Sequence, residues 1–207
     1  MGKEQMHRVG VMGGTFDPIH IGHLVTAEAV RLEYNLEKVI FIPASQPPHK
    51  QGSTVTPAFH RYIMTVMATY SNPFFFVSDM ELNRPGPSYT IDTMKSLISQ
   101  YGGQAEFYFI TGVDAVQDLA TWHNVEELLN LCHFVAATRP GCKDTIENVI
   151  NYFGTKGHER IHRLATPELE ISSTDIREKV RRGLSIKYIV PESVENYILK
   201  ENLYLRT

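Results

Sequence analysis

The chain has 207 residues, of which 43% are hydrophobic and 21% are charged, and its formal net charge at pH 7 is −3. This length favours one domain with one sizeable core. The acidic balance argues against a general nucleic-acid binder, because such proteins normally carry a basic bias. Cys132 and Cys142 are not spaced as metal ligands, and no apolar stretch approaches the length of a membrane span. We therefore expect a cytoplasmic protein that binds neither nucleic acid nor membrane.

Short, continuously apolar runs recur along the chain, as expected for strands buried on both faces of a sheet. They are Val9–Met12, Val39–Ile42, Phe74–Val77, Ala105–Ile110, Phe134–Ala137 and, less clearly apolar, His162–Ala165. Helical patterns lie between them, at Leu24–Tyr34, His60–Tyr70, Ile91–Tyr101, Val125–Leu131 and Asp144–Phe153. This alternation predicts an α/β fold with a doubly wound parallel sheet.

Two further helices are expected near the end of the chain, at Ser172–Arg182 and Pro191–Lys200. We predict a single domain over residues 1–207, on which a C-terminal helical segment at about 171–207 packs. In the second helical pattern, Ile63, Met64, Met67 and Ala68 stand at helical spacing.

The segment Gly13–His23, with the sequence GGTFDPIHIGH, follows the first apolar run. In a doubly wound sheet, ligands bind outside the carboxyl ends of the strands, so we expect this segment at the binding edge. Gly13 and Gly14 allow a ligand to approach the backbone closely and permit a positive φ. A helix that begins near Ile21 or Gly22 would add exposed N–H groups that attract an anion. The segment predicts a phosphate site, although neither GxGxxG nor GxxxxGK[ST] occurs.

His20 and His23 are three residues apart, so both imidazoles can face the same side of the loop and the first helical turn. They could hold a metal ion, but no third ligand stands at a defined spacing. They could also be one core histidine and one surface histidine. Because they follow two glycines and lie at a helix N-terminus, we favour contact with phosphate oxygens.

A second candidate phosphate site is Ile171–Arg177, with the sequence ISSTDIR. Ser172 followed by Asp175 resembles a capping box, so a helix start is expected here even without a ligand. Arg177 lies one turn after Ser173. Hydroxyl groups, backbone N–H groups and a guanidinium can therefore converge on one anion.

The string GTFDPIHIGH resembles the (H/T)xGH signature of the nucleotidylyltransferase superfamily, and ISSTDIR resembles its C-terminal phosphate motif. The resemblance implies a Rossmann-like fold with helices on both faces of the sheet. It implies that His20, His23 and Arg177 contact the nucleotide triphosphate and stabilise the transition state. Lys50, on the polar loop after the second strand, could close over the phosphates or remain a solvated lysine. The implied ATP and phosphate contacts are Gly13, Gly14, Thr15, Phe16, Lys50, Ser172, Ser173 and Thr174.

Further stretches resemble the bacterial nicotinate mononucleotide adenylyltransferase family over almost the whole chain. They are PPHK at 47–50, RPGPSYTIDT at 84–93, FITGVD at 109–114, TWH at 121–123 and RPG at 139–141. The resemblance implies that Trp122 stacks on the nicotinate ring and that Asp114 binds ribose. Without it, Trp122 could be a core residue, Asp114 a helix N-cap, and Ser88 or Thr90 a cap of the next helix. The implied contacts of the nicotinate nucleotide are Ser88, Tyr89, Thr90, Gly112, Asp114, Trp122 and Arg139.

The implied reaction transfers the adenylyl group of ATP to nicotinate mononucleotide, giving deamido-NAD and pyrophosphate in NAD biosynthesis. The acceptor phosphate is already anionic, so no general base is needed. Mg²⁺ is expected on the triphosphate, held mainly by substrate oxygens and water, so we predict no metal site built from protein side chains. The alternatives are another adenylyl- or cytidylyltransferase, such as the pantetheine-phosphate type, a synthetase fragment, and a nucleotide-binding module without catalysis. The resemblance also allows a homo-oligomer.

Overall fold

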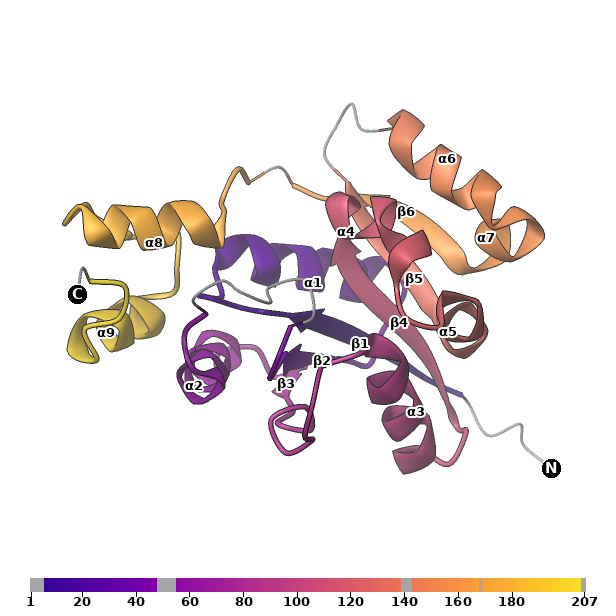
Figure 1. Ribbon diagram of the computed structural model, residues 1–207, viewed down its shortest axis with the longest axis horizontal. Coiled ribbons are helices and arrows are strands. Elements are labelled where there is room, and N and C mark those ends of the chain that lie inside the picture. The colour runs from indigo at the N-terminus through magenta and orange to yellow at the C-terminus, as the bar shows by residue number, and fades with distance from the viewer. Residues whose placement is uncertain (1–5, 48–54, 139–142, 168, 206–207) are drawn as a thin grey trace. The chain divides into compact units, whose positions relative to one another are not determined.

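The computed structural model describes residues 6–47, 55–138, 143–167 and 169–205 (Figure 1). In chain order the elements are β1 (His7–Gly14), α1 (Ile21–Glu33), β2 (Lys38–Pro43), α2 (Ala58–Thr69), β3 (Phe75–Val77), α3 (Thr90–Gln100), β4 (Ala105–Gly112), α4 (Val113–Gln117), the 3-10 helix η2 (Leu119–Thr121), α5 (Val125–Leu131), β5 (His133–Thr138), α6 (Lys143–Tyr152), α7 (Gly154–Arg160), β6 (Ile161–Ala165), α8 (Ser173–Arg181) and α9 (Glu192–Lys200). Every predicted strand and helix is present, with small differences at the ends. The short helices α4, η2 and α7 were not predicted. Within the described ranges, no helix is long and apolar enough to cross a membrane.

The strands form one six-stranded sheet in the order β3-β2-β1-β4-β5-β6. β1 pairs with β4, β4 with β5, and β5 with β6, all in parallel. Val9 of β1 lies opposite Phe107 of β4, and both are buried, as is Phe134 of β5. The strands β1, β2 and β3 follow one another toward one edge of the sheet, and β4, β5 and β6 follow one another from β1 toward the other edge. The strand order therefore reverses between β1 and β4. The predicted Rossmann-like, doubly wound α/β fold is confirmed.

The chain divides into two compact units. The first comprises Met1–Gly13, Thr26–Ile40 and Tyr89–Glu168, and in it α3 packs on α5 and α6 packs on α7 (Figure 1). The second comprises Gly14–Val25, Phe41–Ser88 and Leu169–Thr207, and in it α2 packs on β3 and on α9. The single domain over residues 1–207 stays a prediction.

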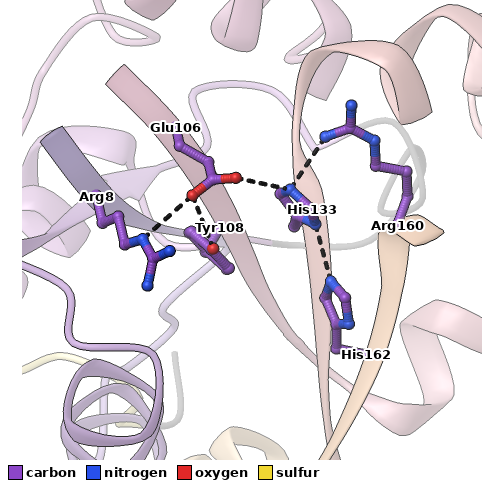
Figure 2. Close-up of polar contacts among 6 residues, drawn as sticks. All are labelled: Arg8, Glu106, Tyr108, His133, Arg160 and His162. Atoms are coloured by element: carbon purple, nitrogen blue, oxygen red, sulfur yellow. Dashed lines mark hydrogen bonds and ion pairs between the residues drawn. The ribbon is translucent and has the colours of Figure 1, made fainter. Parts of the chain in front are cut away.

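Polar side chains gather near the amino ends of neighbouring strands in the first unit (Figure 2). Oε2 of Glu106 accepts a hydrogen bond from the Tyr108 hydroxyl at 2.9 Å and lies 3.3 Å from Nε of Arg8. Its Oε1 lies 3.2 Å from Nε2 of His133, whose Nδ1 lies 2.8 Å from Nε2 of His162. This network therefore ties β1, β4, β5 and β6 together at the end opposite the predicted ligand edge.

The two histidines of this network titrate abnormally. Burial lowers the pKa of His133, and the nearby Arg160 lowers it further, while Glu106 raises it. Burial, followed by the charges of His133 and Arg160, lowers the pKa of His162, and Glu106 again opposes the shift. In both residues the folded pKa lies below the reference value of 6.5. As the pH falls through that value, the unfolded chain takes up protons first, so the folded state loses stability.

We expect the substitution His162→Gln to flatten the fall in unfolding free energy between about pH 7.5 and pH 5. Glutamine keeps a polar group that can hydrogen-bond to His133 but cannot take up a proton. The slope should decrease by at most about 1.4 kcal/mol per pH unit, the value for one proton. Urea unfolding at each pH measures it, with His158→Gln on the exposed surface of α7 as the control. Equal slopes in the two variants would contradict the assignment.

Candidate functional site

The predicted phosphate segment Gly13–His23, called the phosphate loop below, begins in the last two residues of β1 and ends in the first turn of α1, which begins at Ile21, as expected. The residue with a left-handed backbone is Phe16, with a φ of 48°, and not Gly13 or Gly14. The two glycines are needed for space instead. A Cβ atom on Gly14 would lie 3.0 Å from the ring of Phe16, and one on Gly13 would lie 3.0 Å from the ring of Phe109. The positive φ that the sequence suggested for a glycine is therefore taken by an aromatic residue.

The start of α1 offers fewer N–H groups to an anion than the sequence suggested. The N–H of Ile21 donates to the carbonyl of Ile189 at 3.0 Å, and the N–H of His23 donates to the carbonyl of His20 at 3.0 Å. These donors are already satisfied within the protein. Side chains, more than the helix start, must therefore supply the contacts to a phosphate.

His20 and His23 lie together in the second unit, with their ring centroids 3.7 Å apart and their planes at 27°. The backbone N–H of His20 donates to Nδ1 of His23 at 3.2 Å. Neutral His23 therefore carries its proton on Nε2. His20 is only 7% exposed, and within the described part of the chain its Nδ1 has no hydrogen-bond partner. Because buried polar atoms are seldom unpaired, this atom points to a site that a ligand completes.

Both imidazoles are neutral at pH 7. Burial lowers the pKa of His20 to about 4. Burial, and then the charge of His20, lowers the pKa of His23 well below its usual value. The pair can therefore donate neutral N–H groups to an anion but brings no positive charge to it.

The two predicted phosphate motifs meet in the second unit. The Ser173 hydroxyl donates to the carbonyl of Pro18 at 2.9 Å, and Nη1 of Arg177 donates to the carbonyl of Asp17 at 2.7 Å. These pairs are 155 and 160 residues apart in the chain. Nη2 of Arg177 donates to Oγ1 of Thr174 at 3.2 Å. Arg177 is thus held beside the loop, with the guanidinium charge that the neutral histidines lack.

Two of the predicted serines already take part in hydrogen bonds within the second unit. Oγ of Ser172 accepts from the N–H of Asp175 at 3.0 Å and caps α8, as the sequence predicted. Oγ of Ser88 accepts from the N–H groups of Ser45 and Gln46, at 3.0 and 3.3 Å. In each case the hydroxyl oxygen acts as an acceptor, so its proton remains to be donated to a ligand.

The start of α3, in the first unit, is capped by neither predicted residue. Tyr89 is the N-cap, and Thr90 is the first helical residue. The carbonyl of Tyr89 accepts from the N–H groups of Asp92 and Thr93. The ring of Tyr89 lies 4.6 Å from that of His123. The interpretation of Ser88 or Thr90 as the cap is therefore wrong, because the capping position is occupied by Tyr89, which lies between them.

The other nicotinate candidates that the structure describes lie at the end of β4 and just after it, in the first unit. Gly112 is the N-cap of α4, and Asp114 is an exposed residue in its first turn, so the N-cap interpretation of Asp114 is wrong. Trp122 is half-buried, with its ring 5.8 Å from Phe109 and 5.9 Å from Phe134, both in edge-to-face contact. These two contacts fix the orientation of the indole ring.

The predicted residues therefore divide between the units. The second unit holds Gly14, Thr15, Phe16, His20, His23, Ser88, Ser172, Ser173, Thr174 and Arg177, and the first holds Gly13, Tyr89, Thr90, Gly112, Asp114 and Trp122. Lys50 and Arg139 lie outside the described residues. Among the residues that are described, no group of three or more His, Cys, Asp or Glu side chains could hold a metal ion. The expectation of no protein metal site stays a prediction.

Arg61 of α2 contacts the loop and was not predicted. Nη1 donates to the carbonyl of Thr15 at 2.6 Å, Nε to that of Thr56 at 2.8 Å, and Nη2 to that of Ser45 at 3.2 Å. The side chain is 1% exposed. A buried guanidinium needs such acceptors, and here they are backbone carbonyls of two loops.

A signal for Arg61 was present in the sequence. Of the apolar residues at helical spacing in α2, Met64 and Ala68 are buried, whereas Met67 is 38% exposed. The buried residues are Arg61, Met64, Thr65, Ala68 and Thr69. Arg61 is thus a charged residue in line with the buried stripe of a helix, and this position indicates a buried polar contact.

Comparison with known proteins gives consistent results. The sequence model of the cytidylyltransferase-like family matches residues 11–179. A protein of Thermoanaerobacter sp. (strain X514), named "Probable nicotinate-nucleotide adenylyltransferase", is 54% identical over 202 residues, which are 97% of this chain and 96% of the relative. A protein of the same name from Moorella thermoacetica is 52% identical over 198 residues, 95% of this chain and 91% of that protein.

The fold also resembles solved structures. Plasmodium falciparum nicotinic acid mononucleotide adenylyltransferase complexed with NaAD matches with a TM-score of 0.77 and 23% identity, over 96% of this chain and 97% of that chain. The same protein complexed with APC matches with a TM-score of 0.75. At this identity the likeness shows the fold alone, and it agrees with the Rossmann-like sheet described above.

Proposed function

The chain belongs to the nicotinate-nucleotide adenylyltransferase family, and from this premise we propose that it transfers the adenylyl group of ATP to nicotinate mononucleotide, giving deamido-NAD and pyrophosphate. The observation that carries the proposal is the junction of the two phosphate motifs. Ser173 and Arg177 donate to loop carbonyls that precede His20. This arrangement places a cation, hydroxyl groups and neutral imidazoles beside one loop, as transfer between phosphates requires.

In the proposed reaction, a phosphate oxygen of nicotinate mononucleotide forms a bond to the α-phosphorus of ATP. The bond from that phosphorus to the bridging oxygen of the β-phosphate breaks, and pyrophosphate leaves. The nucleophile is anionic at neutral pH, so no protein base is required. The protein has to align the two phosphates and offset their repulsion.

The described contacts support a separate role for each donor. His23 carries its proton on Nε2, since its Nδ1 accepts from the backbone, and this N–H can donate to a phosphate oxygen. Among the described residues, the buried Nδ1 of His20 has no hydrogen-bond partner, and a ligand would satisfy it. Arg177 uses two of its several N–H groups in the bonds to Asp17 and Thr174, so others can reach the charge that develops on the leaving group.

We propose that Mg²⁺ accompanies ATP and is held mainly by phosphate oxygens and water. The hard cation prefers oxygen ligands. The carboxylate of the phosphate loop is engaged elsewhere, since Asp17 accepts hydrogen bonds from Tyr204 and from the N–H of Thr56. The site residues of the second unit thus contribute imidazoles, hydroxyls and a guanidinium, and the ion would neutralise the triphosphate when bound.

For the acceptor, we propose that the nicotinate ring stacks on Trp122, that Asp114 binds its ribose, and that the hydroxyls of Ser88, Tyr89 and Thr90 serve its carboxylate. The fixed, half-buried indole supports the first role, and the exposure of Asp114 supports the second. Gly112, Lys50 and Arg139 complete the proposed set on the family resemblance alone. A homo-oligomer stays a prediction.

The test is pyrophosphate release with ATP and Mg²⁺, in the presence of nicotinate mononucleotide, nicotinamide mononucleotide or phosphopantetheine. Release that strongly favours the nicotinate form supports the reaction and the acceptor site. Release with phosphopantetheine alone would keep the phosphate motifs and overturn the roles of Trp122 and Asp114. No release with any acceptor would favour a nucleotide-binding module.

Gly22 offers a mild way to displace His20. A Cβ atom at position 22 would lie 3.0 Å from Nδ1 and 3.1 Å from Cε1 of that ring. We expect Gly22→Ala to shift the imidazole by a few tenths of an ångström and to lower kcat by about 10-fold, because catalysis depends steeply on alignment. In a His20→Ala background the same change should have little further effect. A full 10-fold loss in that background would show that Gly22 acts in another way.

A further inference from the structure

Asp17, in the middle of the phosphate loop, is buried and is held through both side-chain oxygens. It is 6% exposed. Oδ1 accepts from the hydroxyl of Tyr204 at 2.9 Å, and Oδ2 accepts from the N–H of Thr56 at 3.2 Å. A buried carboxylate is costly unless hydrogen bonds satisfy it, so these bonds fix where Asp17 lies. They also make it unsuited to act as a base or a metal ligand.

The backbone of the same residue orients Arg177. The carbonyl of Asp17 accepts from Nη1 at 2.7 Å, a short hydrogen bond assisted by the charge of the guanidinium. The next carbonyl, that of Pro18, accepts from the hydroxyl of Ser173 at 2.9 Å. A change that displaces Asp17 therefore moves the acceptor on which the proposed phosphate-binding arginine depends.

Arg61 holds the preceding part of the loop through its bond to the carbonyl of Thr15 at 2.6 Å. Between the two anchored positions lies Phe16, with a φ of 48°. This left-handed conformation is unfavourable for a residue with a side chain and persists only where the surroundings enforce it. The bonds on both sides of Phe16 supply that constraint.

We propose that Asp17, Arg61 and Tyr204 form a loop anchor, a set of positioning residues that aligns Arg177 with the phosphates of ATP. The proposal rests on the role of Arg177 in the proposed function. Tyr204 comes from the C-terminal end of the chain and acts through Asp17. It is a positioning residue to which the sequence motifs assigned no role.

The hydroxyl of Tyr204 is suited to this role over the whole working pH range. Burial, followed by the charge of Asp17 and the hydrogen bond to it, raises the pKa of Tyr204 well above its usual value. The hydroxyl therefore keeps its proton and remains a donor to the carboxylate. Replacement by phenylalanine removes the donor and keeps the ring.

The test compares Tyr204→Phe with Tyr197→Phe. The hydroxyl of Tyr197 lies 2.9 Å from Nδ1 of His60, so each change removes one tyrosine hydroxyl bond from the same C-terminal segment. We expect Tyr204→Phe to lower kcat by about 5- to 20-fold. This range corresponds to the loss of one hydrogen bond to a charged group, when only part of that loss raises the activation barrier. The KM for ATP should also rise, but by less than kcat falls, because the orientation of Arg177 matters more in the transition state than in the bound ground state.

Tyr197→Phe should keep kcat within about 2-fold of the parent protein, even if both variants lose similar thermal stability. Equal kcat values in the two variants would overturn the proposal. A second measurement places Tyr204→Phe in an Arg177→Ala background. In that background, Tyr204→Phe should alter kcat by less than about 2-fold. A loss there as large as in the parent would show that Tyr204 does not act through Arg177.

Failure of this proposal can be told apart from failure of the proposed function. Absence of pyrophosphate release by the parent protein with every acceptor would count against the function alone. ATP binding, measured by calorimetry, then decides the role of the loop anchor. Weaker binding by Tyr204→Phe than by Tyr197→Phe supports the anchor, and equal binding overturns it.

Discussion

His20→Ala is expected to lower kcat for pyrophosphate release by about two to four orders of magnitude, the scale seen when a preorganised donor to a developing oxyanion is removed. His20 is buried beside His23, and its Nδ1 has no hydrogen-bond partner in the described structure. The ring is neutral because burial lowers its pKa to about 4. The substitution therefore removes a neutral donor and no charge, and the measurement is steady-state kinetics with ATP and nicotinate mononucleotide.

The control for this prediction is His60→Ala. His60 is a half-buried histidine of the same unit, and it contacts Tyr197 instead of the phosphate loop. It should lose stability but keep kcat within about 2-fold. Circular dichroism and thermal unfolding establish that each variant is folded. A folded His20→Ala protein whose kcat is close to that of the parent would contradict the role assigned to His20.

Arg177→Ala is expected to lower kcat by about two to three orders of magnitude. Arg177 brings the positive charge that the neutral histidines do not supply, and its bond to Asp17 places that charge beside the loop. Arg177→Lys should recover only part of the activity, because an ammonium group keeps the charge but lacks the planar geometry to contact Asp17, Thr174 and a phosphate together. Kinetics at saturating ATP separate this loss from weaker binding.

Arg181→Ala is the matched control, one turn later on α8. Arg181 is exposed and donates to Glu178 at 3.1 Å, a surface pair that contributes little to stability. Its removal should leave kcat unchanged within about 2-fold. If Arg181→Ala and Arg177→Ala lower kcat equally, the loss reflects the charge or the stability of α8, and Arg177 has no specific place at the phosphates.

The elements of the fold could be predicted because each has a local signature. Continuous apolar runs such as Phe134–Ala137 indicate strands covered on both faces, and the structure places a parallel strand there. The start of α8 follows from Ser172, whose side chain caps the helix without any distant contact. The helix α4 has 5 residues, too few to show a clear helical period, and α7 (GTKGHER) has no apolar side chains from which such a period could be read.

The family and the two predicted phosphate motifs could also be recognised from the sequence, because the residue types and their spacing are local. The contacts that hold the motifs together are tertiary contacts and could not be predicted. Tyr204 and Asp17 are 187 residues apart, and Arg61 and Thr15 are 46 apart, so no local period relates them. A buried polar group takes the partner that the fold brings to it, and that choice depends on the packing of α2 and the C-terminal segment around the loop. The positive φ of Phe16 is likewise imposed by its anchored neighbours and is not encoded by a glycine.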